Sequence, residues 1–387
     1  MTPSASVFHP SPALVRLFQA FVVAGAFALG AGSFLAPERV WVGALLAAYL
    51  LIGLALAGAV FVATHYASGA AWSVAFRRVP EAMAAVLPAA AVLLILLLAT
   101  QGWLYPWTHQ TRAGHGFKHW WLSRPFFLGR ALVFVVVWTA FVREIVRVSR
   151  RQDQEGGIAL RRQNTRLSVA FLVVFGASFW LASYDWVMSL EPEWYSTVFG
   201  IYNFAGLFSG GLAAVIMLVI WLQSAGPLRG VVNEEHYHDL GKLLFGFTTF
   251  WMYIWFCQYM LIWYANIPEE TAYFIRRQRL YWQPLFLLNV ILNWVVPFFI
   301  LLLRPAKRNP RALAKAAAVV LAGRWLDVYL MIVPPFSGAV PWFGVWELAL
   351  TLGVIGLFLL LFLRAFRQAS PVPWRDPGLA ESLHYHT

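Results

Sequence analysis

Charged residues are scarce in this chain of 387 residues. Asp, Glu, Lys and Arg together make up 12% of it, whereas 60% of the residues are hydrophobic. The mean hydropathy is +0.66. A soluble globular domain is about half apolar and about a quarter charged. The shortage of charge therefore excludes an ordinary soluble domain and favours a protein that lies within a membrane.

Cysteine and intramembrane histidine are also rare, and their rarity excludes several redox centres. The single cysteine, Cys257, lies inside an apolar run, so the chain cannot form an internal disulfide, an iron–sulfur site or a covalent haem attachment. Of nine histidines, only His65 touches a predicted span. A b-type cytochrome or a haem–copper oxidase core needs several histidines at membrane depth. We predict no redox cofactor and no metal bound by this chain, and we assign His236 and His238 to a solvated loop.

Apolar runs of roughly 20 residues recur along the chain, which is the length that an α-helix needs to cross a bilayer. The sequence predicts an all-α polytopic membrane protein with about ten transmembrane helices in a membrane domain at 13–366, between tails at 1–12 and 367–387. No basic residue precedes Arg16, so we expect a retained first helix rather than a signal peptide. The ten predicted spans are 13–33, 41–64, 82–102, 125–147, 167–188, 200–223, 241–264, 282–303, 313–333 and 345–366.

Basic residues cluster in alternate loops, which predicts the direction of the helices. The net charge of +12 is explained by these loops, so nucleic-acid binding is not expected. The pattern places both termini in the cytoplasm. The predicted cytoplasmic side holds Arg77, Arg78, Arg143, Arg147, Arg150, Arg151, Arg161, Arg162, Arg166, Arg229, Lys242, Arg304, Lys307, Arg308, Arg311, Lys315, Arg364, Arg367 and Arg375.

Two fragments suggest an internal repeat with an offset of four spans. The fifth span carries Asp185 with Met188, and the ninth carries Asp327 with Met331, each after a basic loop. The third and seventh spans both leave the membrane through a Trp followed shortly by a Pro. These fragments predict two parallel four-helix bundles, spans 2–5 and 6–9, flanked by spans 1 and 10.

The clearest intramembrane charges are Arg324 and Asp327 of the predicted ninth span. A charge in the hydrocarbon core costs at least about 2.5–3.5 kcal/mol on insertion scales, so each one needs a reason. Three residues apart, the two side chains share one helical face. Either they form an intrahelical ion pair that makes their burial tolerable, or they take part in a proton or ion relay.

Other polar residues in the spans complete the set of relay candidates. Asp185 has no basic neighbour within four residues along the chain, so it needs a partner from another helix, water, or a raised pKa. Asn289 and Asn293 share one helical face, where they either form hydrogen bonds between helices or line a polar channel. Glu144 lies between Arg143 and Arg147, where a structural pair is the simplest role. The proton-relay candidates are Asp185, Arg324, Asp327, Glu144 and Asn293.

The stretch "DWVMSLEPEWYSTVFG", residues 185–200, is long and mixed in composition. It resembles the pattern of the ActF-type membrane subunit of bacterial alternative complex III, a quinol:cytochrome c oxidoreductase, within the NrfD/PsrC-like family. The positions that carry the resemblance are Asp185, Trp186, Met188, Ser189, Leu190, Glu191, Pro192, Trp194, Ser196, Thr197, Phe199 and Gly200. In this stretch Glu191 and Glu193 flank Pro192 just outside the predicted span.

The resemblance implies a subunit of the bacterial cytoplasmic membrane that supports assembly and, as a second role, proton translocation. It implies partners: a multihaem cytochrome c subunit, an iron–sulfur subunit, a related NrfD-like membrane subunit and small membrane subunits. Haem c and iron–sulfur clusters are then expected in those partners, and quinone or quinol is a candidate ligand. The outer loop Trp103 to Arg124, rich in Trp and His, is expected to anchor at the membrane interface and to contact partners.

Two other functions remain open from the sequence. A stand-alone proton- or cation-coupled transporter would explain the intramembrane charges, although many transporters use inverted repeats rather than parallel ones. An integral membrane enzyme acting on a lipid or isoprenoid would need clustered acidic or His ligands at one interface.

Overall fold

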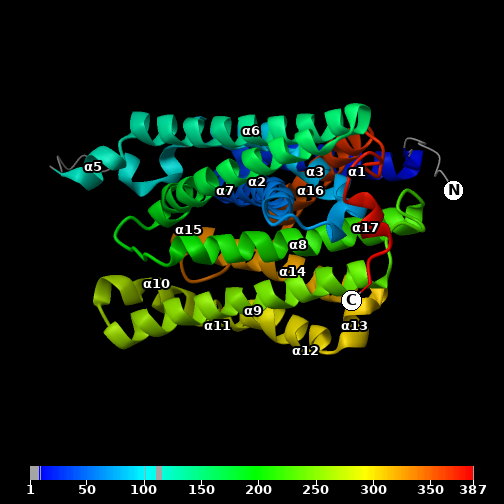
Figure 1. The fold of residues 1–387 in the computed structure, drawn as a ribbon. Helices are drawn as coiled ribbons and strands as arrows, with labels where there is room; N and C mark the ends of the chain where they lie inside the picture. The colour runs from blue at the N-terminus through cyan, green and yellow to red at the C-terminus, as the bar shows by residue number, and fades with distance from the viewer. Residues whose placement is uncertain (1–7, 9, 101, 110–115, 387) are drawn as a thin grey trace.

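The computed structural model describes residues 8, 10–100, 102–109 and 116–386, and 82% of the chain is helical. No strand occurs within these ranges, so the predicted all-α fold is confirmed. The long helices run side by side along one direction, and both termini lie at the same end of the molecule (Figure 1). The predicted tail at 1–12 falls largely outside the described residues, since its structure is described only at residue 8 and from residue 10 onward.

Nine helical segments in the described part of the chain are long and apolar enough to cross a membrane. Their bounds are α1 Pro12–Leu35, α2 Pro37–Ala67, α3 Arg78–Ala84 with α4 Leu87–Thr100, α6 Arg124–Glu155, α7 Ile158–Trp186 with the 3₁₀ turn η4 Met188–Leu190, α8 Phe199–Ala225, α9 Glu234–Ala265, α11 Gln283–Val290 through α12 Val296–Leu302, and α16 Val345–Phe366.

The ninth predicted span, 313–333, corresponds to α14, Pro310–Ile332, which is not among these nine. It has 23 residues, enough for a crossing, but it carries Arg311, Lys315, Arg324 and Asp327. Nearly all of its second half is buried, and it packs against α8, α9, α11 and α12. Arg324 and Asp327 are therefore surrounded by other helices rather than by lipid.

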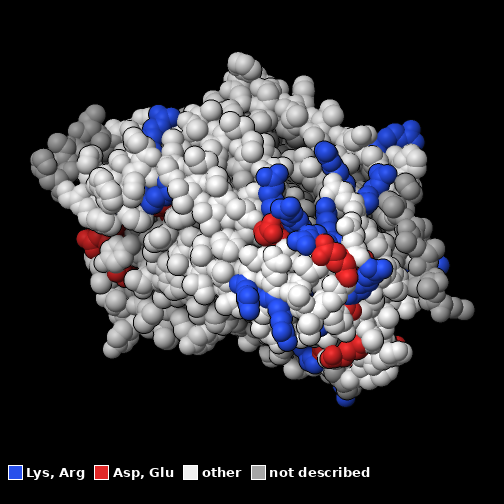
Figure 2. All heavy atoms as spheres, turned by 45° about the horizontal axis from the view of Figure 1, so that its top comes forward, with Lys and Arg blue, Asp and Glu red and all other residues white. Residues whose placement is uncertain are grey.

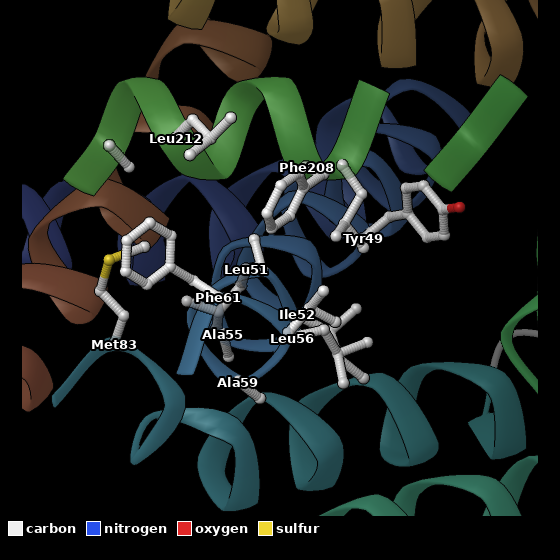
Figure 3. Packing of buried hydrophobic residues seen from close by; sticks show 14 of the residues in the cluster. Tyr49, Leu51, Ile52, Ala55, Leu56, Ala59, Phe61, Met83, Phe208 and Leu212 are labelled. Carbon is white, nitrogen blue, oxygen red and sulfur yellow. The ribbon is translucent and has the colours of Figure 1, made fainter. Parts of the chain in front are cut away.

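The helices form two groups of four with a flanking pair, as the sequence predicts. The first bundle contains α2, α3–α4, α6 and α7, and the second contains α8, α9, α11–α12 and α14. The outer helices α1 and α16 pack against each other and against α2. Contacts of α2 and α7 with α8 join the two bundles, and Figure 3 shows Leu51 of α2 beside Phe208 of α8.

Glycine lets the flanking helices approach closely. A Cβ atom on Gly25 of α1 would lie 2.6 Å from the Cα of Gly353 on α16, and one on Gly356 would lie 2.6 Å from the carbonyl oxygen of Phe18. Membrane helices associate through such small residues, because lipid supplies no hydrophobic drive between them. These positions explain how an apolar helix with little burial of its own, α1, is held in place.

Several helix limits differ from the prediction because polar turns extend beyond the hydrophobic core. Helices α6 and α7 both reach the turn at Gly156 and Gly157, whose φ values of 72° and 89° favour glycine. Helix α9 begins at Glu234, earlier than predicted, because Asn233 caps it and His236 completes a capping box. The assignment of His236 and His238 to a solvated loop is therefore wrong: both lie buried in the first turns of α9.

Short elements complete the chain at both ends of the bundles. They are η1 Trp72–Phe76, η2 Gly102–Leu104, η3 Pro106–Thr108, α5 Phe117–Trp121, α10 Pro268–Gln278, the π-helical turn η5 Ile291–Val295, α13 Arg304–Arg308, α15 Pro334–Ser337 and α17 Leu379–Leu383. The predicted contact loop Trp103–Arg124 includes residues 110–115, which lie outside the described residues. Within its described part, Phe117 and Trp120 are exposed.

The C-terminal segment 371–386, which we term the C-terminal strap, crosses the end of the molecule that carries both termini. The Ser382 hydroxyl donates to the Trp72 carbonyl (2.6 Å) and accepts from the Ala75 amide (3.0 Å). The Tyr385 hydroxyl donates to Asp239 of α9 (2.5 Å). The strap thus connects the α2–α3 junction of the first bundle to the start of α9 in the second bundle.

Acid should loosen this strap. Burial raises the pKa of Asp376, but Arg77 (2.6 Å), the Gly378 amide and Arg161 outweigh burial and hold that pKa below the usual 3.8. A carboxyl whose folded pKa is depressed adds stability above its unfolded pKa and loses it as pH falls through the folded value. We expect the protection of residues 371–386 against hydrogen exchange, measured relative to the unfolded chain at the same pH, to fall below about pH 3.8. The variant Asp376→Asn should already exchange faster at pH 7, and equal exchange in variant and parent would contradict this account.

Candidate functional site

The Asp327 carboxylate lies at the centre of a polar network inside the second bundle, and its side chain has no exposed surface. Its Oδ2 accepts from Arg324 Nη1 (2.5 Å) and from the Trp251 indole N–H (3.2 Å). Its Oδ1 accepts from the Tyr202 hydroxyl and from the Asn289 amide (3.2 Å). The donors come from α14, α9, α8 and α11, so each of the four spans of the second bundle supplies one donor. Arg324 and Asp327 thus form an intrahelical ion pair, which was one of the two interpretations of their spacing.

Glycines on α8 and α14 leave the space that this network occupies. A Cβ atom on Gly206 would lie 2.2 Å from Arg324 Nη1 and 3.2 Å from Asp327 Oδ2. One on Gly210 would lie 3.0 Å from Arg324 Cγ, and one on Gly323 would meet the Asn293 amide at 2.9 Å. The guanidinium is therefore packed directly against the backbone of α8.

The variant Gly206→Ala should displace the Arg324 guanidinium from Asp327. Overpacking of a well-packed interior costs about 1–3 kcal/mol, and we expect a loss of stability in that range, measured as a lower thermal unfolding midpoint in detergent. Gly176→Ala on α7 is the matched control, because a Cβ there meets nothing within 4 Å. Equal midpoints for the two variants would show that the guanidinium has room to move aside.

A π-helical turn places Asn293 next to this network. Residues Ile291–Val295 form one wide turn between α11 and α12, and Asn293 is buried within it. The Asn293 amide donates to the Asn289 side-chain oxygen (2.7 Å), while Asn289 donates onward to Asp327. Single π-helical turns within α-helices are frequent at functional sites. Of the five relay candidates, the structure brings together Arg324, Asp327 and Asn293.

An apolar cavity of about 260 Å³ lies on the other side of Arg324. It is enclosed by α2, α8, α14 and α16 and one residue of α7, and its wall includes Tyr49, Ile52 and Gly210. Arg324 is its only charged wall residue, within the described part of the chain. In that same part, the one hydrogen bond of the guanidinium is to Asp327. Arg324 therefore borders both Asp327 and the cavity, and its side chain is 9% exposed.

A second charged cluster connects the network to the predicted outer end. Arg277 of α10 is buried and donates to the Leu330 carbonyl (2.7 Å), one turn beyond Asp327 on α14. Its Nη2 also donates to Glu191 (2.7 Å), which pairs with Arg276 (2.8 Å). The sequence places Glu191 just outside the span, and the structure pairs it there with two arginines of its own chain.

Asp185 belongs to a separate site in the first bundle. Arg130 of α6 donates to both carboxylate oxygens at 2.9 Å, and the Trp121 indole donates at 2.9 Å. The guanidinium also lies over the Trp121 ring, 3.9 Å from its centroid. The expected partner from another helix is thus Arg130. Asp185 joins α5, α6 and α7 at the predicted outer end, in a different bundle from Asp327.

Glu144 is not connected to either buried site in the described residues. Its side chain is 39% exposed and pairs with Arg147 at 3.6 Å on the surface of α6. The structure therefore supports the surface pair that the neighbouring arginines suggest. Glu347, in the first turn of α16, pairs with Arg39 of α2 at 2.8 Å.

Sequence reasoning missed Tyr202, Trp251 and Arg277. Tyr202 and Trp251 lie in aromatic-rich spans, where nothing distinguishes a ring that donates to a buried carboxylate from one that only packs. Arg277 lies in "FIRRQRL", where a basic loop residue and a buried one look alike. The acidic "LEPE" turn, on the same predicted side, was the one indication of a buried arginine, because its carboxylates need a basic partner.

The fold establishes a general class. Neither a scan of protein-family models nor a search of curated proteins found a match. The chain is an integral, multi-pass, all-α membrane protein whose second bundle holds a buried, hydrogen-bonded Arg–Asp pair beside a cavity.

Proposed function

We propose that this chain is the membrane subunit, without a redox cofactor of its own, of a quinol:cytochrome c oxidoreductase of the alternative complex III type, in a bacterial cytoplasmic membrane. In this proposal, the Arg324–Asp327 site transfers protons within the membrane and the rest of the fold supports assembly. The partners would be a multihaem cytochrome c subunit, an iron–sulfur subunit, a related membrane subunit and small membrane subunits. The stretch 185–200 is the feature of the sequence that points to this complex.

The observation that carries the proton-transfer role is the position of Arg324 between Asp327 and the cavity. A buried carboxylate is tolerated only while it is paired and hydrogen-bonded, and Asp327 meets both conditions through four donors. Movement of the guanidinium toward the cavity would remove the only cation that contacts Asp327 within the described residues. An acid that loses its counter-ion takes up a proton more readily. The Arg324 guanidinium can thus take two positions. Asp327 would bind a proton when the guanidinium lies toward the cavity and release it when the guanidinium returns.

Polar groups on both sides of Asp327 supply the remaining parts of a route. Tyr202 of α8 donates to Asp327, and toward the predicted outer end the Arg277–Glu191 pair contacts the backbone of α14 at Leu330. On the other side, Asn289 and Asn293 extend along the interrupted helix α11–α12. Hydroxyl and amide groups form hydrogen bonds with the water molecules through which protons move. The arginines stay protonated and make the local environment positive along the route.

A membrane quinone fits the cavity beside Arg324 by its chemistry. The apolar walls suit an isoprenoid chain, and the free N–H groups of Arg324 suit a carbonyl oxygen. A neutral head is preferred, because Arg324 and Asp327 already balance each other and a further anion would be uncompensated. The reduced form of such a group, the quinol, would supply protons when it is oxidised to the quinone, while Arg324 would hold its oxygen and Asp327 would hold a proton.

The test uses the intact complex in liposomes and compares proton release with quinol oxidation. The charge-balanced variant Arg324→Gln/Asp327→Asn removes the carrier without leaving a lone buried charge. We expect its ratio of protons released to quinol oxidised to fall, with assembly retained. Arg130→Gln/Asp185→Asn in the first bundle is the matched control and should keep that ratio. Parental proton release in the first variant would refute the proton-transfer role, and purification without haem-containing partners would refute the complex.

A stand-alone proton- or cation-coupled transporter is the second candidate, and one observation favours it. The helix formed by α11 and α12 is interrupted by a π-helical turn beside a buried carboxylate. Transporters commonly build midplane binding sites from such discontinuous helices. Transport by the purified chain alone in liposomes would select this function over the first.

A further inference from the structure

A cleft of about 650 Å³ lies between the ends of α4, α6 and α16 on the side of the molecule that carries both termini. It differs from the Arg324 cavity in position and in chemistry. Its walls are arginines and glutamines and its floor is apolar. The residues that line it are Ala85, Pro88, Ala89, Val142, Arg143, Val146, Arg147, Arg150, Arg151, Gln154, Leu361, Arg364, Ala365 and Gln368.

The cleft carries one sign of charge. Five arginines line it, and no carboxylate does so among the described residues. Arg147 and Arg151 have acidic partners outside the lining, Glu144 and Glu155. For Arg143 and Arg364, the described residues provide no ion pair. Figure 2 shows that Lys and Arg side chains gather at this end of the molecule, whereas few appear at the opposite end.

The cleft is also a shaped feature rather than a group of free side chains. Arg150 donates to the Gln368 side chain (2.9 Å) and to the Ala365 carbonyl (3.4 Å), so it joins α6 to α16 across the cleft. Below it, Val142 and Val146 are buried and continue into the apolar surface of the spans. A cationic rim therefore lies directly above an apolar floor, at the level where the helices leave the hydrocarbon core.

We propose that this cleft binds an anionic phospholipid, with its phosphate among the arginines and its acyl chains along the floor between α4, α6 and α16. A free phosphate ion would use the rim but would leave the floor bare. A soluble acidic partner would likewise gain nothing from apolar residues at membrane depth. Basic pockets between transmembrane helices are known to take anionic head groups. This inference is independent of the proposed proton-transfer function, because it concerns binding by the resting protein.

The test measures lipid retention by the purified protein complex with native mass spectrometry and titration in detergent. The probes are cardiolipin, phosphatidylglycerol, phosphatidylcholine and inorganic phosphate. Each arginine near an anionic surface contributes about fivefold in affinity, so Arg143→Gln/Arg364→Gln should weaken binding of the anionic lipids by about 25-fold. Phosphatidylcholine should bind weakly to every form.

The matched control is Arg311→Gln/Lys315→Gln on α14, which removes the same charge from exposed positions at the predicted same side and outside the cleft. It should bind anionic lipid as the parent does. Equal loss in both double variants would show a general charge effect and overturn the proposal. Unchanged binding in Arg143→Gln/Arg364→Gln, or displacement of the lipid by millimolar phosphate, would overturn it as well.

Discussion

The variant Asp327→Ala should lose about 3–5 kcal/mol of stability, because it leaves Arg324 as a buried charge without its partner. Tyr202, Trp251 and Asn289 would lose their shared acceptor in the same step. An unpaired buried donor costs about 1–3 kcal/mol on its own, so rearrangement of the network is expected as well. The measurement is the unfolding midpoint of the purified protein in detergent, at several denaturant concentrations.

A charge-balanced variant separates the cost of the lone arginine from the loss of the network. Arg324→Met/Asp327→Leu removes both charges and fills similar volume. Replacing a buried ion pair by apolar residues is often neutral or stabilising. The double variant should therefore be more stable than Asp327→Ala. If the two proved equally unstable, the ion pair would not be the main reason for the loss.

Asp185→Ala should have a loss of similar size, about 3–5 kcal/mol, for the same physical reason. Arg130 is 9% exposed and donates twice to Asp185, and no other carboxylate in the described residues contacts it. Its stacking on Trp121 and Phe126 keeps part of its stabilisation, since cation–π contacts contribute about 0.5–2 kcal/mol. Thermal unfolding in detergent again measures the effect.

The control for Asp185 is Ser178→Ala on the same helix, which removes a hydroxyl that accepts from Trp138 (2.8 Å) but leaves no charge unpaired. Its loss should stay near 1 kcal/mol, as for a single neutral hydrogen bond. An Asp185→Ala protein as stable as Ser178→Ala would mean that Arg130 finds water or another acceptor. The inference that Asp185 holds α5, α6 and α7 together would then be wrong.

These two buried carboxylates differ in what surrounds their arginines. In the first bundle, Arg130 donates to both Asp185 oxygens and to the Trp121 carbonyl, so several of its N–H groups are engaged. In the second bundle, Arg324 makes one hydrogen bond to Asp327 and otherwise borders a cavity. A guanidinium with one fixed contact and open space beside it can move at lower cost. This difference is why the proton-transfer proposal rests on Asp327 rather than on Asp185.

Much of the architecture follows from the sequence, because the physics that decides it is local or depends on composition. Apolar runs of bilayer length determine the number of long helices, and glycine and charge mark their ends. The four-span offset of the two Asp–Met fragments predicts the paired bundles, which the contacts confirm. The Arg324–Asp327 pair is equally local, because i and i+3 share a helical face.

Other features depend on which helices meet, and only the tertiary structure decides them. Arg130 and Asp185 are 55 positions apart, and Tyr202 and Asp327 are 125 apart. No periodicity along one helix indicates which face of another helix it will contact. The π-helical turn and the buried His236 arise in the same way, from side chains that find partners on neighbouring helices. The sequence by itself therefore determined a multi-pass helical protein with a few charged residues inside its membrane spans. The packing of the second bundle decided that one of those charges would lie between a carboxylate and a cavity.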